Sequence, residues 1–509
     1  MMVYLDGNSL TLEHLVAIAR GGAAVALTDA ARDRVRTARA VVDEYALHDD
    51  PTYGINTGFG NFAEVKIPAG SLSQLHINLV RSHAAGVGDP LPVDVVRAMM
   101  ALRANVLAKG FSGIRVETLD LLLELLNRQV HPAVPARGSV GASGDLAPLA
   151  HLALVLIGEG TAAHGDARPD QMVTGAEALA TAGLQPAVLQ AKEGLALING
   201  TQASTALLGL ALADAGRLAR AADIAAALSI DALRGSTHPF DTRIHAARGF
   251  AGQQISAQNL LNLLNASPLN ASHANCGRVQ DAYSLRCTPQ VHGAAREALG
   301  FARRVFETEA NAATDNPMVF ADAREILSGG NFHGAPVGIA SDVVCLAIAQ
   351  LATISERRCE RLVNPAVSGL PAFLTRHGGL ESGLMMAQVT AAAIASEIKT
   401  LAHPASVDTI PTSGNREDHV SMSMSAGLKA ARAADLARHA IACELLCACE
   451  AIDLLAPLRS SPPLMRAHDF IRSRVPAIEH DRSFSPDLRV ISDMIVSGAL
   501  ERSCGVDVN

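Results

Sequence analysis

Three long runs of helix-forming residues constrain the fold of this chain more than any other feature. They read TQASTALLGLALADAGRLARAADIAAAL from Thr201, SDVVCLAIAQLATISERRCERL from Ser341 and AGLKAARAADLARHAIACELLCACEAIDLL from Ala426. Helix propensity summed over windows of this length predicts helices, and their apolar residues are not confined to one stripe. Such helices must pack against one another, so the sequence predicts a bundle of long helices.

The first 195 residues have a different character, because shorter helical segments alternate with turns. Periodicity predicts helices over Val95–Leu107, with Asp94 as the N-cap, and over Val116–Leu126. The turn-rich segments between them are YGINTGFGNF, VHPAVPARGSVGASG and HGDARPD. We therefore expect a mainly α-helical fold, with a smaller mixed N-terminal region over 1–195 and a long-helix bundle and C-terminal helical region over 196–509.

The composition excludes several classes of protein. Of the 509 residues, 49% are hydrophobic and only 18% are charged, so folding or subunit association must cover much of the surface. The net charge of −8 and the lack of a basic run argue against a partner nucleic acid. Uninterrupted apolar runs fall short of the roughly 18–20 residues of a membrane span, and the start MMVYLDGNSLTLEHL carries no basic segment of a secretory signal. We expect an oligomer in the cytoplasm.

Cysteine and histidine do not form a predicted metal site. Cys443 and Cys447 lie one turn apart on a predicted helix, but two further ligands are not in view, so we interpret them as small buried residues. His403 and His419 belong to no His-Glu-x-x-His or similar set and are interpreted as structural. The eight cysteines show no disulfide-domain spacing, which favours a reducing compartment.

The stretch GSVGASGDLAPLAH, from Gly138 to His151, allows two interpretations. It lacks both the Gly-x-Ser-x-Gly pattern of a hydrolase nucleophile elbow and the lysine of a phosphate-binding loop. The first interpretation is a glycine-rich turn that caps a helix, with Asp145 at the N-cap or in the first turn and Pro148 early enough to be tolerated.

The second interpretation is that the backbone itself reacts. If the turn is tight, the nitrogen of Gly144 can attack the carbonyl carbon of Ala142. Loss of two waters, one of them with the Ser143 hydroxyl, then leaves an exocyclic methylene on a five-membered ring, an electrophile that no side chain supplies. Glycine permits the close backbone approach, and the N-terminus of the following helix would stabilise negative charge arriving at the ring.

This stretch resembles the segment in which aromatic amino-acid ammonia-lyases form their 4-methylidene-imidazol-5-one (MIO) cofactor. The resemblance spans nearly the whole chain, through YGINTGFG, NLVRSHAAGVG, EGLALINGTQ, VQDAYSLRCTPQVHGA, TDNPMVF, SGGNFHGAPVG, AQVTAAAIASE, NREDHVSM and HDRSFSPDL. It implies a helix bundle of the ammonia-lyase and fumarase-like type, a MIO formed from Ala142, Ser143 and Gly144, and no metal. It also implies a homotetramer whose active sites draw on three subunits, so that YGINTGFG and VQDAYSLRC of one chain would meet Ser143 of another.

The resemblance also assigns roles to single residues. Tyr53 matches the base that takes the β-proton of the substrate, which requires helix N-termini and a nearby cation to favour its phenolate. Arg286 matches the arginine that binds the substrate carboxylate, and Tyr283 shares its face if this piece is helical. The other implied pocket residues are Asn199 beside the MIO, Gln280 and Phe332.

His83 and Glu417 indicate the side chain that is recognised. His83 matches a ring-contacting histidine, and Glu417 matches the glutamate of the histidine-specific branch, which we count with Tyr53, Tyr283 and the MIO triplet as catalytic. Together they can satisfy both nitrogens of an imidazole ring. The resemblance therefore implies non-oxidative elimination of ammonia from an L-amino acid, with L-histidine to trans-urocanate as the expected reaction.

Other functions stay open at this stage. Arg416 stands where the histidine branch usually carries glutamine, and LVNPAVSGLPAFL lacks a lysine of that branch. A tyrosine ammonia-lyase or a tyrosine 2,3-aminomutase on the same scaffold is therefore the first alternative. A hydrolase that uses Ser143 as a plain nucleophile and a non-catalytic helical assembly protein are the alternatives from other classes.

Overall fold

The computed structural model describes residues 1–165 and 171–509, so most of the predicted turn HGDARPD at 164–170 lies outside the described residues. The chain divides into two compact units. Unit 1 contains Met1–Leu210, Arg303–Ser341 and Pro404–Leu428, and unit 2 contains Ala211–Ala302, Asp342–His403 and Lys429–Asn509. These units interleave along the chain, whereas the division expected at residue 195 is contiguous and stays a prediction.

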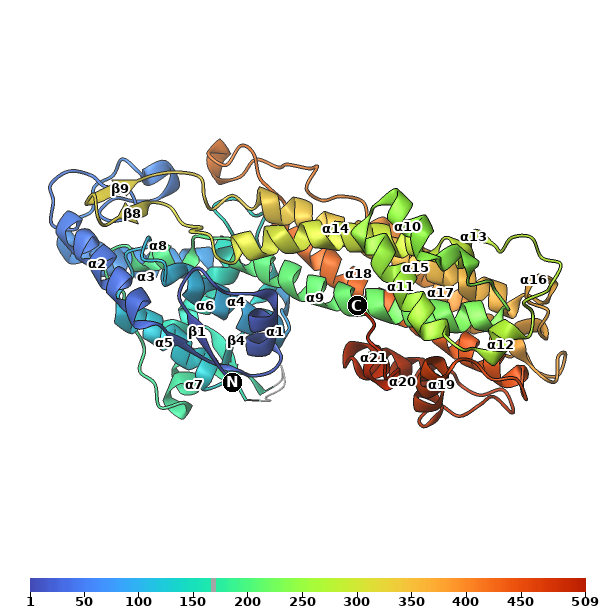
Figure 1. Ribbon diagram of the computed structural model, residues 1–509. Coiled ribbons are helices and arrows are strands. Elements are labelled where there is room, and N and C mark those ends of the chain that lie inside the picture. The colour runs from blue at the N-terminus through green and yellow to red at the C-terminus, as the bar shows by residue number, and fades with distance from the viewer. Residues whose placement is uncertain (166–170) are drawn as a thin grey trace. The chain divides into compact units, whose positions relative to one another are not determined.

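Unit 1 combines helices of moderate length with four small sheets (Figure 1). Its strands are β1 (Met2–Leu5), β2 (Ala24–Leu27), β3 (Val87–Pro90), β4 (Val130–Pro132), β5 (Pro135–Arg137), β6 (Thr161–His164), β7 (Val173–Thr174), β8 (Met318–Phe320) and β9 (Glu325–Leu327). Its helices are α1 (Leu12–Ala19), α2 (Asp29–Tyr45), α3 (Leu72–His83), α4 (Val93–Leu107), α5 (Val116–Asn127), α6 (Leu146–Leu156), α7 (Gly175–Thr181) and α8 (Glu193–Ile198), with 3-10 turns η1 (Gly60–Phe62), η2 (Ala69–Ser71) and η6 (Ser413–Asn415). Strands β1 and β2 pair in parallel; the sheets β3-β5, β4-β6-β7 and β8-β9 are antiparallel.

Four long helices contribute residues to both units: α9 (Gln202–Ala232), α14 (Thr288–Glu309), α15 (Ala335–Val363) and α18 (Ser423–Leu454). Three of them, α9, α15 and α18, are the helices predicted from the apolar runs, and the mainly α-helical fold class is confirmed. Helix α15 alone among the described residues is long and apolar enough to cross a membrane, but 67% of its most apolar window is buried inside the protein. That burial is the property of a core helix.

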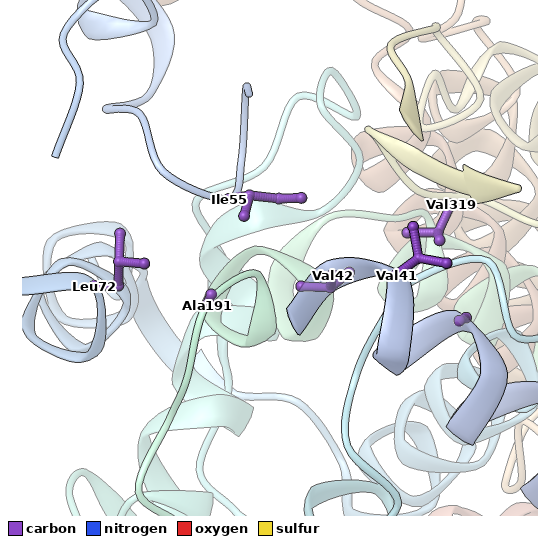
Figure 2. Packing of buried hydrophobic residues seen from close by; sticks show 7 residues of the cluster. Val41, Val42, Ile55, Leu72, Ala191 and Val319 are labelled. Carbon is purple, nitrogen blue, oxygen red and sulfur yellow. The ribbon is translucent and has the colours of Figure 1, made fainter. Parts of the chain in front are cut away.

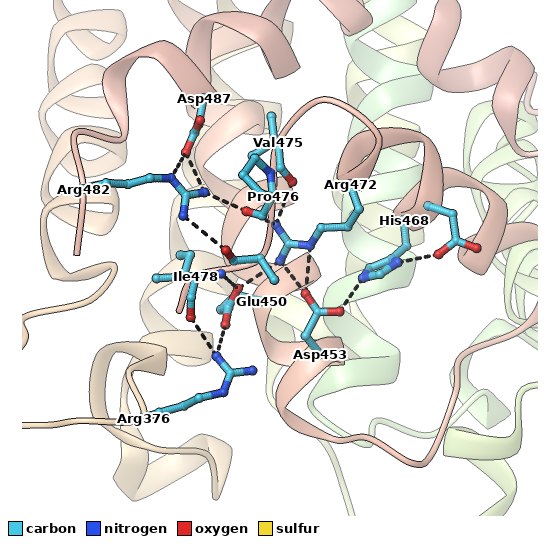
Figure 3. Close-up of polar contacts among 12 residues, drawn as sticks. Arg376, Glu450, Asp453, His468, Arg472, Val475, Pro476, Ile478, Arg482 and Asp487 are labelled. Carbon is cyan, nitrogen blue, oxygen red and sulfur yellow. Dashed lines mark hydrogen bonds and ion pairs between the residues drawn. The ribbon is translucent and has the colours of Figure 1, made fainter. Parts of the chain in front are cut away.

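Unit 2 is otherwise built from shorter helices. They are α10 (Thr242–Arg248), α11 (Ala251–Leu264), α12 (Pro268–Ala271), α13 (Tyr283–Arg286), α16 (Pro365–Ser368), α17 (Met385–Leu401), α19 (Pro462–Arg472), α20 (Ser485–Val496) and α21 (Ala499–Ser503), with turns η4 (His238–Phe240) and η5 (Ala372–Leu374). Figure 3 shows one polar network that joins them. The buried carboxylate of Glu450 accepts hydrogen bonds from Arg376 (2.7 Å), Arg472 (3.0 Å) and the backbone of Ile478 (3.0 Å), which ties α18 to α19 and the segment after it.

The two short helices predicted from periodicity are present, with one correction. Helix α5 begins at Val116 as predicted. Helix α4 begins at Val93 with Pro92 as its N-cap, so the prediction that Asp94 is the N-cap is wrong. The extended backbone of Pro92 starts the helix earlier, and Asp94 instead occupies the first turn, where its carboxylate pairs with Arg20 at 2.9 Å.

A hydrophobic cluster in unit 1 fixes the segment that carries Tyr53. Figure 2 shows Ile55, two residues after Tyr53, among side chains from distant parts of the sequence. The buried members of this cluster are Ala38, Val41, Val42, Ile55, Leu72, Ala191 and Val319. Because Ile55 is fully buried, the Tyr53 segment is anchored by packing although it is rich in glycine.

The short helix α8 is entirely buried and depends on Arg103 of α4. The Arg103 guanidinium donates to the carbonyls of Ala196 (3.0 Å) and Asn199 (2.7 Å) and to Oε1 of Gln202 (2.8 Å). Burial lowers the pKa of Arg103 to about 10, so the group remains charged at neutral pH. One buried cation therefore caps the C-terminal end of α8 and holds the Asn199 backbone in place.

We expect Arg103→Met to lower the free energy of unfolding by about 3–5 kcal/mol, because it leaves buried carbonyls without donors. Chemical denaturation followed by circular dichroism measures the change. Arg36→Met is the matched control, since Arg36 pairs with Asp33 at 2.9 Å where both side chains are mostly exposed. That variant should change stability by less than about 1 kcal/mol. Equal effects of the two substitutions would contradict this account of α8.

Candidate active site

The Ala142-Ser143-Gly144 triplet lies in a sharp turn of left-handed backbone. The φ angles are 72° at Gly141, 51° at Ser143 and 72° at Gly144. Gly144 forms a bridge with Gly200, and the next residue, Asp145, donates its N–H to the Gly200 carbonyl at 2.7 Å. A Cβ atom on Gly144 would overlap the backbone of Gly200, so this position requires glycine.

Asp145 stands at the N-cap of α6, one of the two positions predicted for it, but its side chain does not cap the helix. The fully buried carboxylate instead accepts hydrogen bonds from Ser139 (2.8 Å) and from the backbone and hydroxyl of Ser204 (2.8 and 2.9 Å). Burial raises the pKa of Asp145 even though these hydrogen bonds oppose the shift. Asp145 therefore ties the turn to the start of α9, and Pro148 fits the first turn of α6.

Ser143 makes two contacts with residues that the sequence singles out. Its hydroxyl donates to Oε1 of Glu417 at 2.6 Å, and its carbonyl oxygen accepts a hydrogen bond from Nδ2 of Asn199 at 3.2 Å. Asn199 is buried, and its Oδ1 has no hydrogen-bond partner within the described residues. The structure thus brings Ser143, Asn199 and Glu417 together from three separate segments of unit 1.

The Glu417 carboxylate is held at both oxygens. Thr412 Oγ1 donates to Oε2 at 2.5 Å, while Oε1 faces the Ser143 hydroxyl. Between these residues the backbone bends back on itself, with left-handed residues at 413–415 and a bridge from Thr412 to Glu417. Burial alone would raise the pKa of Glu417, but hydrogen bonds from Ser143, Thr412 and Ser413 lower it below its usual value, as does the charge of His83 at the acidic pH where that ring is protonated. The group is a carboxylate at neutral pH.

The segment that carries Tyr53 contacts the loop that carries Glu417. The 3-10 turn η1, which follows Tyr53, contacts η6 just before Glu417. Burial raises the pKa of Tyr53, the Glu417 charge raises it further, and the Gly60 N–H lowers it. The YGINTGFG segment thus contacts the Glu417 loop of its own chain, and the expectation that it meets Ser143 of another chain stays a prediction.

His83, the last residue of α3, is partly buried and presents one ring nitrogen to the protein. Its Nδ1 lies 2.9 Å from the Leu79 carbonyl, which can only accept, so Nδ1 carries the proton. Burial lowers the pKa of His83, although the Leu79 carbonyl and the Glu417 charge oppose the shift. At neutral pH the ring is therefore neutral, and Nε2 is an acceptor.

Phe332 also belongs to unit 1, and its segment is hydrogen-bonded to the Ala-Ser-Gly turn. Gly334, two residues later, donates its N–H to the Gly141 carbonyl at 3.1 Å, and Ser421 donates to the same oxygen at 2.8 Å. These contacts tie the SGGNFHG segment and the residues after Glu417 to the Ala-Ser-Gly turn.

Gln280, Tyr283 and Arg286 form a second cluster, in unit 2. The Arg286 guanidinium lies 4.7 Å from the centre of the Tyr283 ring, so the two residues share a face of α13 as predicted. Gln280 and Arg286 line a cavity of about 520 Å³, and Nε of Arg286 is buried without a hydrogen-bond partner in the described chain. Within the described residues, this cluster belongs to a different unit from Ser143.

Sequence reasoning missed Thr412 and Arg103, for which no local pattern exists, and Ser204, which lies in the first turn of α9. The described residues contain no group of three or more His, Cys, Asp or Glu side chains suited to a metal ion. His419 stacks on His333 with ring centres 5.9 Å apart. Cys443 and Cys447 are fully buried, as predicted.

Comparison with known proteins identifies the family of this chain. A profile described as aromatic amino acid lyase matches residues 10–473. The chain belongs to the aromatic amino acid lyase family. It is 57% identical to the histidine ammonia-lyase of Anaeromyxobacter dehalogenans, over 98% of this chain and 99% of that protein.

Solved structures of family members agree with the fold. The histidine ammonia-lyase from Trypanosoma cruzi is 44% identical, with a TM-score of 0.92 over 99% of this chain and 95% of that chain. The tyrosine aminomutase from Streptomyces globisporus is 36% identical, with a TM-score of 0.95 over the full length of both chains. The fold is thus shared by members that act on different amino acids, and the side chains of the site must discriminate between them.

Proposed function

We propose that this lyase is a histidine ammonia-lyase, which eliminates ammonia from L-histidine without oxidation and releases trans-urocanate. The observation that carries the proposal is the meeting of Glu417, with its carboxylate held at both oxygens, and the Ala-Ser-Gly turn in unit 1. The relatives that match over their full length at 53–57% identity are histidine ammonia-lyases, which supports the same substrate.

The residues of the turn fit a MIO cofactor formed from Ala142, Ser143 and Gly144. Ala142 is small and buried, Ser143 and Gly144 have left-handed backbone, and Gly200 leaves no room for a side chain at 144. The unpartnered Oδ1 of Asn199 adds an acceptor beside the turn. When formed, the MIO supplies the electrophile that converts the substrate amine into a better leaving group. No metal takes part in this proposal.

Two residues and one helix N-terminus of unit 1 act on charge and protons in the proposed reaction. Tyr53 is the base that removes the β-proton of the substrate. Asn199 donates from Nδ2 to the Ser143 carbonyl oxygen and so stabilises negative charge on that oxygen. The N-terminus of α6 begins two residues after Gly144 and adds to this stabilisation.

His83 and Glu417 are the residues that we assign to the imidazole ring. Nε2 of His83 is an acceptor, and the Glu417 carboxylate accepts charge-assisted hydrogen bonds. Histidine offers an N–H to such acceptors, whereas a phenyl ring would leave Oε1 of the partly buried carboxylate without a donor once the Ser143 hydroxyl has gone. Phe332 supplies an apolar wall in this proposal.

Gln280, Tyr283 and Arg286 complete the site from a neighbouring chain of a homotetramer in this proposal, with Arg286 binding the substrate carboxylate and Tyr283 counted as catalytic. The exposure of Tyr283 (71%) and Val279 (95%) supports an interface at this segment, because large apolar side chains gain stability when a partner covers them. We assign the tetramer to the cytoplasm, where its eight free cysteines stay reduced, and expect neither nucleic acid nor a membrane as a partner.

A tyrosine ammonia-lyase or tyrosine 2,3-aminomutase is the second candidate. The observation that favours it is the likeness to the tyrosine aminomutase structure, at 36% identity over the whole chain. A phenol can also donate a hydrogen bond to Glu417 or His83. The kinetic comparison below separates the two.

The first prediction is that the purified enzyme is lighter than its encoded sequence by two waters. Mass spectrometry of the peptide that spans Ala142, Ser143 and Gly144 locates the loss. Ser143→Ala cannot lose the water that contains Oγ, so it should be at most one water lighter than its encoded mass, and it should keep the helical circular dichroism spectrum but lose nearly all activity. An unmodified wild-type peptide from active enzyme would exclude the cofactor.

The second prediction concerns pH. Burial and the Glu417 charge raise the pKa of Tyr53, so the phenol predominates at neutral pH and the active phenolate increases as pH rises. We therefore expect kcat/KM to rise through the neutral and into the alkaline range. Tyr53→Phe should lower kcat/KM by roughly 10²–10⁴-fold and flatten this limb of the profile. Near-normal activity of Tyr53→Phe would mean that the base lies elsewhere.

The third prediction concerns the substrate. Steady-state kinetics should give a kcat/KM for histidine that exceeds that for phenylalanine by roughly 10⁴–10⁵-fold and that for tyrosine by less. Glu417→Gln should reduce histidine turnover because the charged acceptor is lost. Its activity is expressed per molecule that carries the complete cofactor. A wild-type preference for tyrosine would replace the proposed substrate with that of the second candidate.

A further inference from the structure

The hydrogen bond between Ser143 and Glu417 bears on how the Ala142-Ser143-Gly144 triplet would mature into MIO. The Ser143 oxygen, 2.6 Å from Oε1 of Glu417, is the atom that must leave as water. Glu417 is the only carboxyl group in the described chain that hydrogen-bonds this hydroxyl. The nearest carboxylate in sequence, Asp145, is committed to Ser139 and Ser204 instead. A proton donor or acceptor is therefore already placed at the departing oxygen.

We propose that Glu417 is a catalytic residue of cofactor formation, in addition to its part in substrate recognition; the inference rests on the proposed MIO. Glu417 takes the proton from Cα of Ser143 and returns it to Oγ as that oxygen departs. The Cα–H bond breaks, its electron pair forms the Cα=Cβ double bond, the Cβ–Oγ bond breaks, and the hydroxyl leaves as water. The carboxylate is regenerated, and no oxidant or other reactant is needed.

The geometry suits one oxygen to both transfers. Cα and Oγ of a serine are separated by only two bonds, so a group hydrogen-bonded to Oγ lies within a few ångströms of Cα. Thr412 holds Oε2 at 2.5 Å and leaves Oε1 directed at Ser143. The ring closure, in which the Gly144 nitrogen bonds the Ala142 carbonyl carbon and that oxygen leaves as water, is a separate dehydration that we do not assign to Glu417.

The same step would prepare the substrate site. Before maturation, Oε1 of Glu417 is occupied by the Ser143 hydroxyl, and after it that donor no longer exists. The carboxylate keeps its anchor to Thr412 and gains a free acceptor oxygen at the position that the Ser143 hydroxyl has left. A chain that has not matured would therefore have its recognition carboxylate already satisfied.

The test follows maturation itself and not turnover. The full chain is made by cell-free synthesis, samples are taken over time, and the peptide spanning Ala142–Gly144 is weighed by mass spectrometry. Wild type should lose two waters. Glu417→Gln keeps the shape and an acceptor but cannot carry the proton, so loss of the water that contains Ser143 Oγ should slow by about 100-fold or more. The Gln peptide should then accumulate with one water lost or none.

Two further variants control the comparison. Asp418→Asn removes the neighbouring charge, on an exposed side chain, and should mature at the wild-type rate. Glu417→Asp keeps the acid on a shorter arm, so it should lose both waters more slowly than wild type; it decides the question if Glu417→Gln fails to fold by circular dichroism. If folded Glu417→Gln matures at the wild-type rate, this inference is overturned while the proposed function stands. If Glu417→Gln does not fold, maturation of Glu417→Asp at the wild-type rate has the same consequence. A wild-type peptide that keeps both waters would overturn the proposed cofactor itself.

Discussion

The close backbone contact between Gly144 and Gly200 is the constraint on which the candidate site depends. It holds the turn in its left-handed conformation and, through the Asp145 N–H bonded to the Gly200 carbonyl, fixes the start of α6. The residue before Gly200 is Asn199, whose amide reaches the Ser143 carbonyl. One contact between two glycines thus sets both the shape of the Ala142-Ser143-Gly144 triplet and the position of the donor beside it.

That contact is rigid because α8 cannot move independently. Glu193 at its start pairs with Arg115 at 2.6 Å, and Lys192 just before it pairs with Asp315 at 3.4 Å, with Glu193, Lys192 and Asp315 all buried. At its other end Arg103 binds the backbone carbonyls. Buried charges contribute little net stability, but removing one partner is costly, so they fix one arrangement of the helix. Precise sites need this kind of support from behind the reacting residues.

The sequence was sufficient for the features that local patterns encode. The long helices follow from helix propensity over long windows, and the left-handed turn follows from the Gly-Ala-Ser-Gly cluster ahead of a helix. It failed where a side chain chooses between local and distant partners. Aspartate is a common N-cap residue, but neither Asp94 nor Asp145 caps its helix with its side chain. The Asp94 carboxylate pairs with Arg20, and the Asp145 carboxylate accepts hydrogen bonds from Ser139 and Ser204.

The contacts of Thr412 with Glu417, and of Arg103 with α8, are also beyond sequence reasoning. Neither has a fixed spacing to its partner, because the fold alone determines that the segments meet. The packing of Ile55 and the contact of η1 with η6, which bring the Tyr53 segment to the Glu417 loop, are likewise set by the fold and not by a local pattern.

Under the proposed function, the charge of Glu417 couples substrate recognition to the ionisation of Tyr53. Burial is the main cause of the raised pKa of Tyr53 and the Glu417 carboxylate adds to it, so the residue proposed to select the substrate also opposes ionisation of the proposed base. A ring that donates an N–H to Glu417 draws charge away from the carboxylate and weakens this opposition, while a phenyl ring leaves it in full. Under the proposed function, histidine therefore gains twice from Glu417, once in binding and once in the ionisation of Tyr53. Discrimination against phenylalanine should for this reason appear in kcat as well as in KM.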